Sequence, residues 1–138
     1  YHDAEIIVGA RNFGCGSSRE AAVYALEANG IRAVIAPSFG DIFFNNCLAN
    51  GVLPVRLDEA KVAELRDQLH RDPRARVAID LADQTVTGAD GVVHGFEIDE
   101  FRKRCLLDGV DDVALTLGHE AAMDAFDTAY AARHPWLG

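Results

Sequence analysis

The sequence has few cysteines, few basic residues and no long apolar run, and each of these absences excludes a class of protein. The three cysteines are widely spaced and form no CxxC pair, so neither a disulfide framework nor an iron–sulfur cluster held by this chain is indicated. No apolar stretch approaches the roughly 18 residues that span a bilayer. We expect a protein of a reducing, cytoplasmic compartment with no metal ligands of its own, and we expect Cys47 and Cys105 to be core thiols.

Basic residues are also outnumbered, because 13 Lys and Arg stand against 22 Asp and Glu, for a formal net charge of −9. A nucleic-acid partner needs a basic face, whereas a single local Arg is enough to bind a small anion. With 138 residues, of which 49% are apolar, the chain has the size and composition of one domain with its own core. We expect residues 1–138 to form that single domain. Because Tyr1 is followed almost at once by a strand, we also expect sequence to precede it.

Alternating strand and helix signals predict an α/β fold with a largely parallel sheet, flanking helices and additional antiparallel strands. The right-handed connections of such a fold gather the strand-to-helix loops at one sheet edge, where ligands bind. The loops at residues 14–20 and 37–41 should therefore lie near each other. Pro54 places the third strand at an edge or a bulge. The predicted strands are 6–8, 31–36, 52–57, 76–81, 84–87 and 92–98, and the predicted helices are 18–29, 38–50, 58–71, 99–107 and 119–132.

Two serines are spaced as helix N-caps. Ser17 stands three residues before Glu20, as in a capping box, and Ser38 stands three residues before Asp41. In the helix that follows Ser38, we expect Ile42 and Phe43 to face the core.

The segment GCGSSRE, residues 14–20, carries the densest polar chemistry of the chain. It lies between the first predicted strand and the first predicted helix, where backbone N–H groups and the helix dipole favour an anion. Its two glycines permit backbone angles and close approaches that side chains forbid. We call residues 14–20 the anion cradle and expect them to hold a carboxylate or a phosphate.

Each residue of the anion cradle also has a plainer interpretation. Arg19 suits bidentate binding of a carboxylate, but a surface Arg can equally pair with a neighbouring Glu. Ser17 and Ser18 can be simple caps, because a reactive serine needs activation and no His stands within the motif. Activation would have to come from N–H donors and positive charge, which suits removal of an acidified C–H proton. Cys15 is a candidate nucleophile, and the two glycines form half of a dinucleotide fingerprint.

Residues 12–20, NFGCGSSRE, resemble the signature of the small subunit of 3-isopropylmalate dehydratase, the swivelling domain of the aconitase superfamily. The resemblance covers nearly the whole chain in the family's order. It continues at residues 34–43, 45–46, 50–54, 96–99, 105–109 and 111–117.

The resemblance implies a swivelling β/β/α fold and a large partner subunit that holds a [4Fe-4S] cluster, with no cofactor bound by this chain. The pair would act as a hydro-lyase of leucine biosynthesis that isomerises 2-isopropylmalate to 3-isopropylmalate by dehydration and rehydration. In the family pattern Ser17 is the base that removes the proton α to a carboxylate, and Arg19 binds that carboxylate or stabilises the alkoxide. Ser18 contacts the substrate, with Gly16 and Cys15 beside it, while the cluster acts as Lewis acid for the hydroxyl.

Two departures from the family pattern leave the substrate open. Ala21 stands where family members usually have His, and the family's N-terminal segment with its specificity loop is absent from this sequence. A homoaconitase or a hydratase of methyl-substituted malate or maleate therefore remains an alternative. A nucleotide- or anion-binding module, and a scaffold subunit whose anion cradle only caps a helix, are the alternatives outside the enzyme class.

Overall fold

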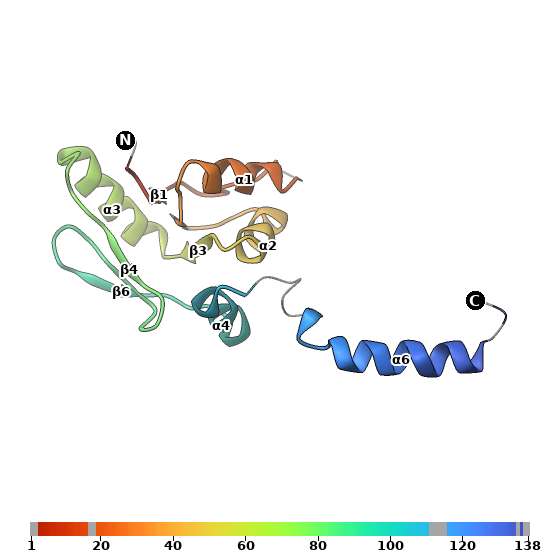
Figure 1. Cartoon of the computed structure of the whole chain (residues 1–138). Coiled ribbons are helices and arrows are strands. Elements are labelled where there is room, and N and C mark those ends of the chain that lie inside the picture. The colour runs from red at the N-terminus through yellow and green to blue at the C-terminus, as the bar shows by residue number, and fades with distance from the viewer. Residues whose placement is uncertain (1–2, 17–18, 111–115, 135, 137–138) are drawn as a thin grey trace.

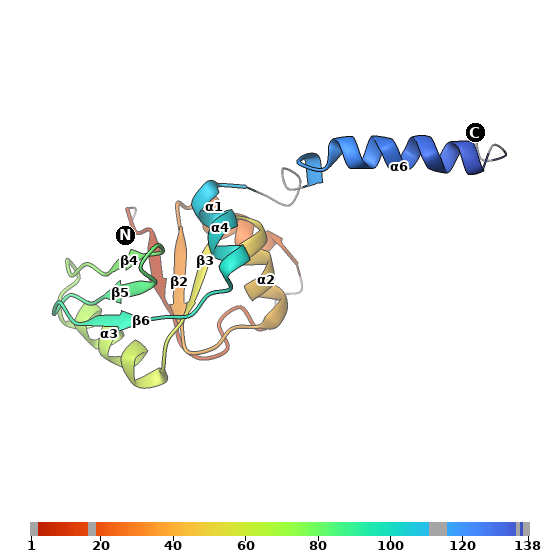
Figure 2. The ribbon, with the colours of Figure 1, turned by 90° about the horizontal axis from the view of Figure 1, so that it is seen from below.

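Two three-stranded sheets organise the chain in the computed structural model, which describes residues 3–16, 19–110, 116–134 and 136 (Figures 1 and 2). The strands are β1 (Ile6–Val8), β2 (Ala33–Ala36), β3 (Leu53–Arg56), β4 (Ala78–Asp80), β5 (Thr85–Thr87) and β6 (Val93–Gly95). The helices are α1 (Ala21–Ala28), α2 (Asp41–Ala49), α3 (Glu59–Arg71), α4 (Glu100–Asp108) and α6 (Glu120–Arg133).

The first sheet is parallel, in the order β1-β2-β3, as the strand and helix pattern predicts. All four residues of the central strand β2 are buried, which fits a parallel strand covered on both faces. Its residues alternate between two clusters, with Ala33 and Ile35 on one face and Val34 and Ala36 on the other. β3 is an edge strand that pairs Pro54 with Val34, so the prediction from Pro54 is confirmed.

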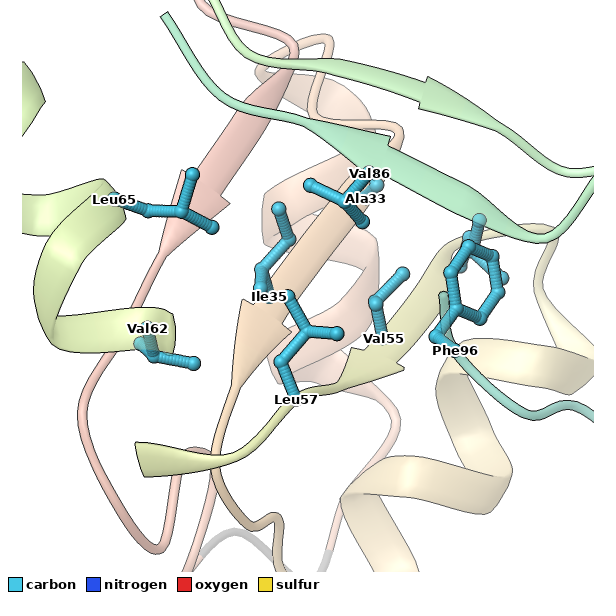
Figure 3. Close-up of a cluster of buried hydrophobic side chains, with 9 residues drawn as sticks. Ala33, Ile35, Val55, Leu57, Val62, Leu65, Val86 and Phe96 are labelled. Carbon is cyan, nitrogen blue, oxygen red and sulfur yellow. The ribbon is translucent and has the colours of Figure 1, made fainter. Parts of the chain in front are cut away.

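The two faces of the parallel sheet are covered by different elements. Helices α1 and α2 cover one face, where Val23, Phe43 and Cys47 are buried. Helix α3 and the second sheet cover the other, and Figure 3 shows residues of these elements pointing toward Ile35 and Val55. The layers are therefore the antiparallel sheet together with α3, the parallel sheet, and helices α1 and α2, which agrees with the expected β/β/α fold.

The second sheet is antiparallel, in the order β4-β5-β6. Its strands lie within the predicted strands 76–81, 84–87 and 92–98, and they form a sheet separate from the parallel one. Val86 in the middle of β5 is completely buried and belongs to the same cluster as Leu65 of α3. The antiparallel sheet thus completes the core.

The helix starts differ from the predicted caps. Helix α1 begins at Ala21, later than predicted, and its N-cap residue Glu20 makes no side-chain cap bond. Ser17, on which the predicted capping box depends, lies outside the described residues. In α2 the N-cap is Gly40, and Ser38 is not a cap. Ile42 is 54% exposed, because it lies on the opposite side of the helix from the buried Cys47.

Helix α6 extends away from the layered body in both views (Figures 1 and 2). It lies where the sequence predicts a helix, yet every one of its residues is exposed. Among the described residues, no helix combines the length and the apolar character needed to cross a membrane.

Candidate functional site

The anion cradle lies at the carboxyl edge of the parallel sheet, where the chain leaves β1 and enters α1. The Phe13 N–H donates to the carbonyl of Ser38 at 3.0 Å, and the Gly40 N–H donates to the carbonyl of Phe13 at 2.9 Å. These two bonds join Phe13 and Phe39 in an isolated parallel bridge. The prediction that the loops after β1 and β2 lie near each other is confirmed.

Side chains add a second connection between these loops. The Asn12 N–H donates to Ser38 Oγ at 2.8 Å, and the Ser38 hydroxyl donates to Asn12 Oδ1 at 3.2 Å. Asn12 has a left-handed backbone, with φ 58°, and its carbonyl accepts the Cys15 N–H at 3.1 Å. Sequence reasoning treated Ser38 as a cap and missed this contact, because the spacing to Asp41 suggested a local partner.

A cluster of three aromatic rings packs against the anion cradle at Gly14. Phe13 packs edge-on against Phe43, with ring centroids 5.6 Å apart, and Phe39 stacks on Phe43 at 6.5 Å. Gly14 lies directly on this cluster, since a Cβ built on it would be 2.2 Å from Cγ of Phe43. Its φ of +72° is also one that favours glycine. Gly14 is therefore required by both its conformation and its packing.

The residues singled out from the sequence fall into two groups. Cys15, Gly16 and Arg19 are exposed at the sheet edge, where a small molecule can reach them. Ser17 and Ser18 lie outside the described residues, so their assigned roles stay predictions. Gly16 has φ +92° and open space around the position of a Cβ. This part of the anion cradle is therefore accessible, whereas Gly14 is packed.

Charges of both signs stand at the start of α1. The first turn of α1 contains no acidic residue, but the N-cap residue Glu20 brings a carboxylate to the positive end of the helix dipole, and Arg19 precedes it in the sequence. Glu20, the nearest carboxylate in the sequence, accepts a hydrogen bond from the Tyr24 hydroxyl at 2.9 Å. This bond and the charge of Glu20 raise the pKa of Tyr24 above its ordinary value. The side chain of Glu20 is therefore directed along the helix toward Tyr24. The sequence alone did not predict this hydrogen bond.

A shallow hollow of about 580 Å³ adjoins the anion cradle on the side of Arg11 and Ser38. Its charged residues have both signs and are largely paired with each other. Arg11 lies 3.5 Å from Glu59, and the Lys61 ammonium lies 2.9 Å from Asp58. The hollow thus has no excess of one charge that would select a ligand by sign.

The three cysteines occupy different environments. Cys47 is completely buried, as predicted, and burial raises the pKa of its thiol to about 12. Cys105, also predicted to be in the core, is only half-buried, while Cys15 is exposed. Within the described part of the chain, no three His, Cys, Asp or Glu side chains gather where they could hold a metal ion.

Comparisons with known families and proteins give consistent results. A family model described as the aconitase C-terminal domain matches residues 1–60. A LeuD_N model matches residues 63–100. A model described as the C-terminal domain of the 3-isopropylmalate dehydratase small subunit matches residues 112–138.

Two relatives named 3-isopropylmalate dehydratase small subunit align with 137 residues, or 99%, of this chain. One, from Dinoroseobacter shibae, is 51% identical, and one from Paramagnetospirillum magneticum is 52% identical. The chain covers 68% of each of these relatives. A crystal structure of 3-isopropylmalate dehydratase from Methanocaldococcus jannaschii matches 87% of the chain and 67% of its own length, with a TM-score of 0.64 and 28% identity.

Proposed function

This chain belongs to the small-subunit family of 3-isopropylmalate dehydratase, and from that premise we propose that it forms half of a dehydratase active site. With a large subunit, it isomerises 2-isopropylmalate to 3-isopropylmalate by dehydration and rehydration, as a hydro-lyase of leucine biosynthesis. The observation that carries this proposal is the identity of about half of all residues over nearly the whole chain with small subunits of that name.

In this proposal the anion cradle handles the carboxylate side of the substrate. Arg19 forms a bidentate pair with the carboxylate next to the reacting carbon. Ser17 removes the proton from that carbon, and Ser18, Gly16 and Cys15 line the bound acid. The N-terminal end of α1 and the guanidinium of Arg19 would stabilise negative charge on the Ser17 oxygen, since the motif at residues 14–20 contains no His to act as a base. The exposure of Arg19 and Gly16 supports these roles, since the substrate must reach them.

The [4Fe-4S] cluster of the family pattern does not fit the described residues of this chain. Cys47 is a buried residue of α2, and Cys15 is exposed in the anion cradle. Cys105 lies on α4, a different element again. We therefore assign the cluster to the large subunit, and this chain contributes proton removal and carboxylate binding only.

The partners follow from the same proposal. The small-subunit family implies a large-subunit partner. We further propose a dicarboxylic hydroxy acid as substrate, no nucleic acid or membrane as partner, and the cytoplasm as the compartment. The acidic net charge of −9 supports the exclusion of nucleic acid.

The proposal is tested by mixing the full-length protein with its large subunit and measuring conversion of 2-isopropylmalate. Ser17→Ala should abolish turnover while the chain keeps its circular dichroism spectrum and melting temperature. Arg19→Lys should reduce kcat/KM, because Lys retains the charge and lacks the bidentate fork. Full turnover with Ser17→Ala would remove Ser17 from the reaction.

Related acids should be assayed in the same mixture, because Ala21 replaces the usual His beside the anion cradle. Faster conversion of a homologous or methyl-substituted acid would keep the dehydratase chemistry and change the substrate. Activity with none of these acids would overturn the proposed function.

A further inference from the structure

We propose that Ser38 and Asn12 form a positioning pair, which sets the angle at which the chain enters the anion cradle. Neither residue belongs to the cradle itself, which begins at Gly14. The inference rests on the proposed function, since it explains how that site is held in its working geometry. Ser38 would act through Asn12 and would not touch the substrate.

The Ser38 hydroxyl is the centre of the pair, because it accepts one hydrogen bond and donates another. It accepts the Asn12 N–H at 2.8 Å and donates to Asn12 Oδ1 at 3.2 Å. Both ends of Asn12, its backbone and its side chain, are therefore fixed by one oxygen on the neighbouring loop. A hydroxyl can do this, and alanine or an acceptor-only carboxylate cannot.

Fixing Asn12 also fixes the turn that follows it. Asn12 adopts a left-handed backbone, which asparagine tolerates better than most residues. In that conformation its carbonyl accepts the Cys15 N–H at 3.1 Å and closes a turn over Phe13 and Gly14. The turn leads into residues 14–16, the described part of the anion cradle that precedes the proposed base in the sequence. A change in the angle of Asn12 therefore displaces residues 14–16.

The side-chain pair is separable from the contacts that keep the two loops together. The backbone bonds between Phe13 and Ser38 and between Gly40 and Phe13 do not depend on any side chain. The aromatic contacts of Phe13 with Phe39 and Phe43 are equally independent of the hydroxyl. Asn12 is exposed, so water can replace its bonds at little cost to folding. Loss of the hydroxyl should thus alter the geometry of the anion cradle more than the stability of the chain.

The main test uses the reconstituted complex of the full-length protein with its large subunit. Ser38→Ala should lower kcat by about 10- to 100-fold, because a displacement near 1 Å has effects of that size. KM should change by less than about threefold, since Arg19 stands next to Glu20, the N-cap of α1, and is further along the chain from the Asn12 turn than residues 14–16 are. Ser38→Thr keeps the hydroxyl and should restore turnover.

Thr128→Ala is the matched control. Its hydroxyl donates to the Asp124 carbonyl at 2.8 Å on α6, so the variant loses a hydroxyl bond of similar length outside the anion cradle. It should leave kcat unchanged. Hydrogen exchange in the same complexes gives a readout independent of activity. Ser38→Ala should speed exchange of the Asn12 amide, while the Gly40 amide, held by a backbone carbonyl, should stay protected.

The possible failures are distinguishable. An inactive wild-type complex would overturn the proposed function. An active wild-type complex with an equally active Ser38→Ala variant would overturn the positioning role alone. The positioning role would also be overturned if Ser38→Thr were as slow as Ser38→Ala, or if the Asn12 amide exchanged at the wild-type rate in Ser38→Ala.

Discussion

The layered body and helix α6 use their apolar residues in opposite ways. In the body, both faces of β2 are buried, and α1, α2, α3 and the antiparallel sheet all contribute side chains to the two clusters. In α6, Phe126 is 64% exposed and Tyr130 45% exposed, although the two rings stack with centroids 5.7 Å apart. The contrast shows that apolar content alone does not make a segment part of the core. Burial depends on whether the topology brings a second face against it.

The contrast is tested most strongly by two isoleucines that differ in burial. Ile35→Ala, at a completely buried position of β2, should lower the free energy of unfolding by about 2 to 5 kcal/mol, because the deletion leaves a cavity. Ile42→Ala, at a position 54% exposed on α2, should change it by less than about 0.5 kcal/mol. Urea unfolding of both variants measures the difference. Similar losses in the two would contradict the assignment of the core.

A second pair of variants separates packing from backbone conformation within the anion cradle. Gly14→Ala and Gly16→Ala both place a Cβ at a positive φ, which costs about 1 to 2 kcal/mol. Only Gly14 also meets Phe43, so its variant should lose about 1 to 3 kcal/mol more through overpacking. The measurement is the difference in unfolding free energy between the two variants. Equal losses would show that the ring of Phe43 can move to accept the added Cβ without a loss of unfolding free energy.

The stability of the protein at alkaline pH depends on the buried thiol of Cys47. The raised pKa of Cys47, about 12 against an ordinary 9.0, means that the unfolded chain loses this proton first as the pH rises. The contribution of the protonated Cys47 thiol to the free energy of unfolding is therefore fully present below the unfolded pKa of 9.0 and is lost as the pH rises toward 12. At pH 10 the loss should be about 1 kcal/mol. The free energy of unfolding is measured at pH 8 and pH 10 for the wild type and for Cys47→Ala. The difference between the two proteins isolates the contribution of Cys47, because all other groups titrate in both proteins. An identical pH dependence would mean that Cys47 is reached by water.

The smallest effect is expected on α6. Phe126→Ala should change the unfolding free energy of the chain by less than about 0.5 kcal/mol, since the ring is mostly exposed. Phe43→Ala, in the body, is the matched comparison and should cost about 3 to 5 kcal/mol. Chemical unfolding of both variants checks this. A loss above about 1 kcal/mol for Phe126→Ala would mean that α6 packs on the body.

Features set by local sequence patterns could be predicted from the sequence. The parallel strands and the meeting of two loops were predictable, because the apolar runs of β1 and β2 alternate with helical patterns and parallel connections have one handedness. The anion cradle was located from its glycines and its polar residues. The roles of Ser17 and Ser18 rest on the resemblance and stay predictions.

Contacts between residues distant in sequence were not predictable. Ser38 and Asn12 are 26 positions apart, and nothing in the local spacing of Ser38 distinguishes this partner from a cap on its own helix. Ile42 has an apolar side chain at the start of a helix, and only the position of α2 on the sheet decides that it is exposed. The separation of the strands into two sheets likewise follows from how the layers stack.

Pro54 in the outer strand β3 has a consequence for how the protein behaves at high concentration. The N–H groups of Leu53 and Leu57 donate toward β2, to Arg32 and Ala36, so the alternation of the strand directs the nitrogen of Pro54 away from the sheet. At that position an added strand would need an N–H donor, and proline has none; Pro54 is also buried, so other parts of the chain cover the edge there. The edge of the parallel sheet is thus protected against pairing with a second molecule while its inner ladder to β2 stays intact.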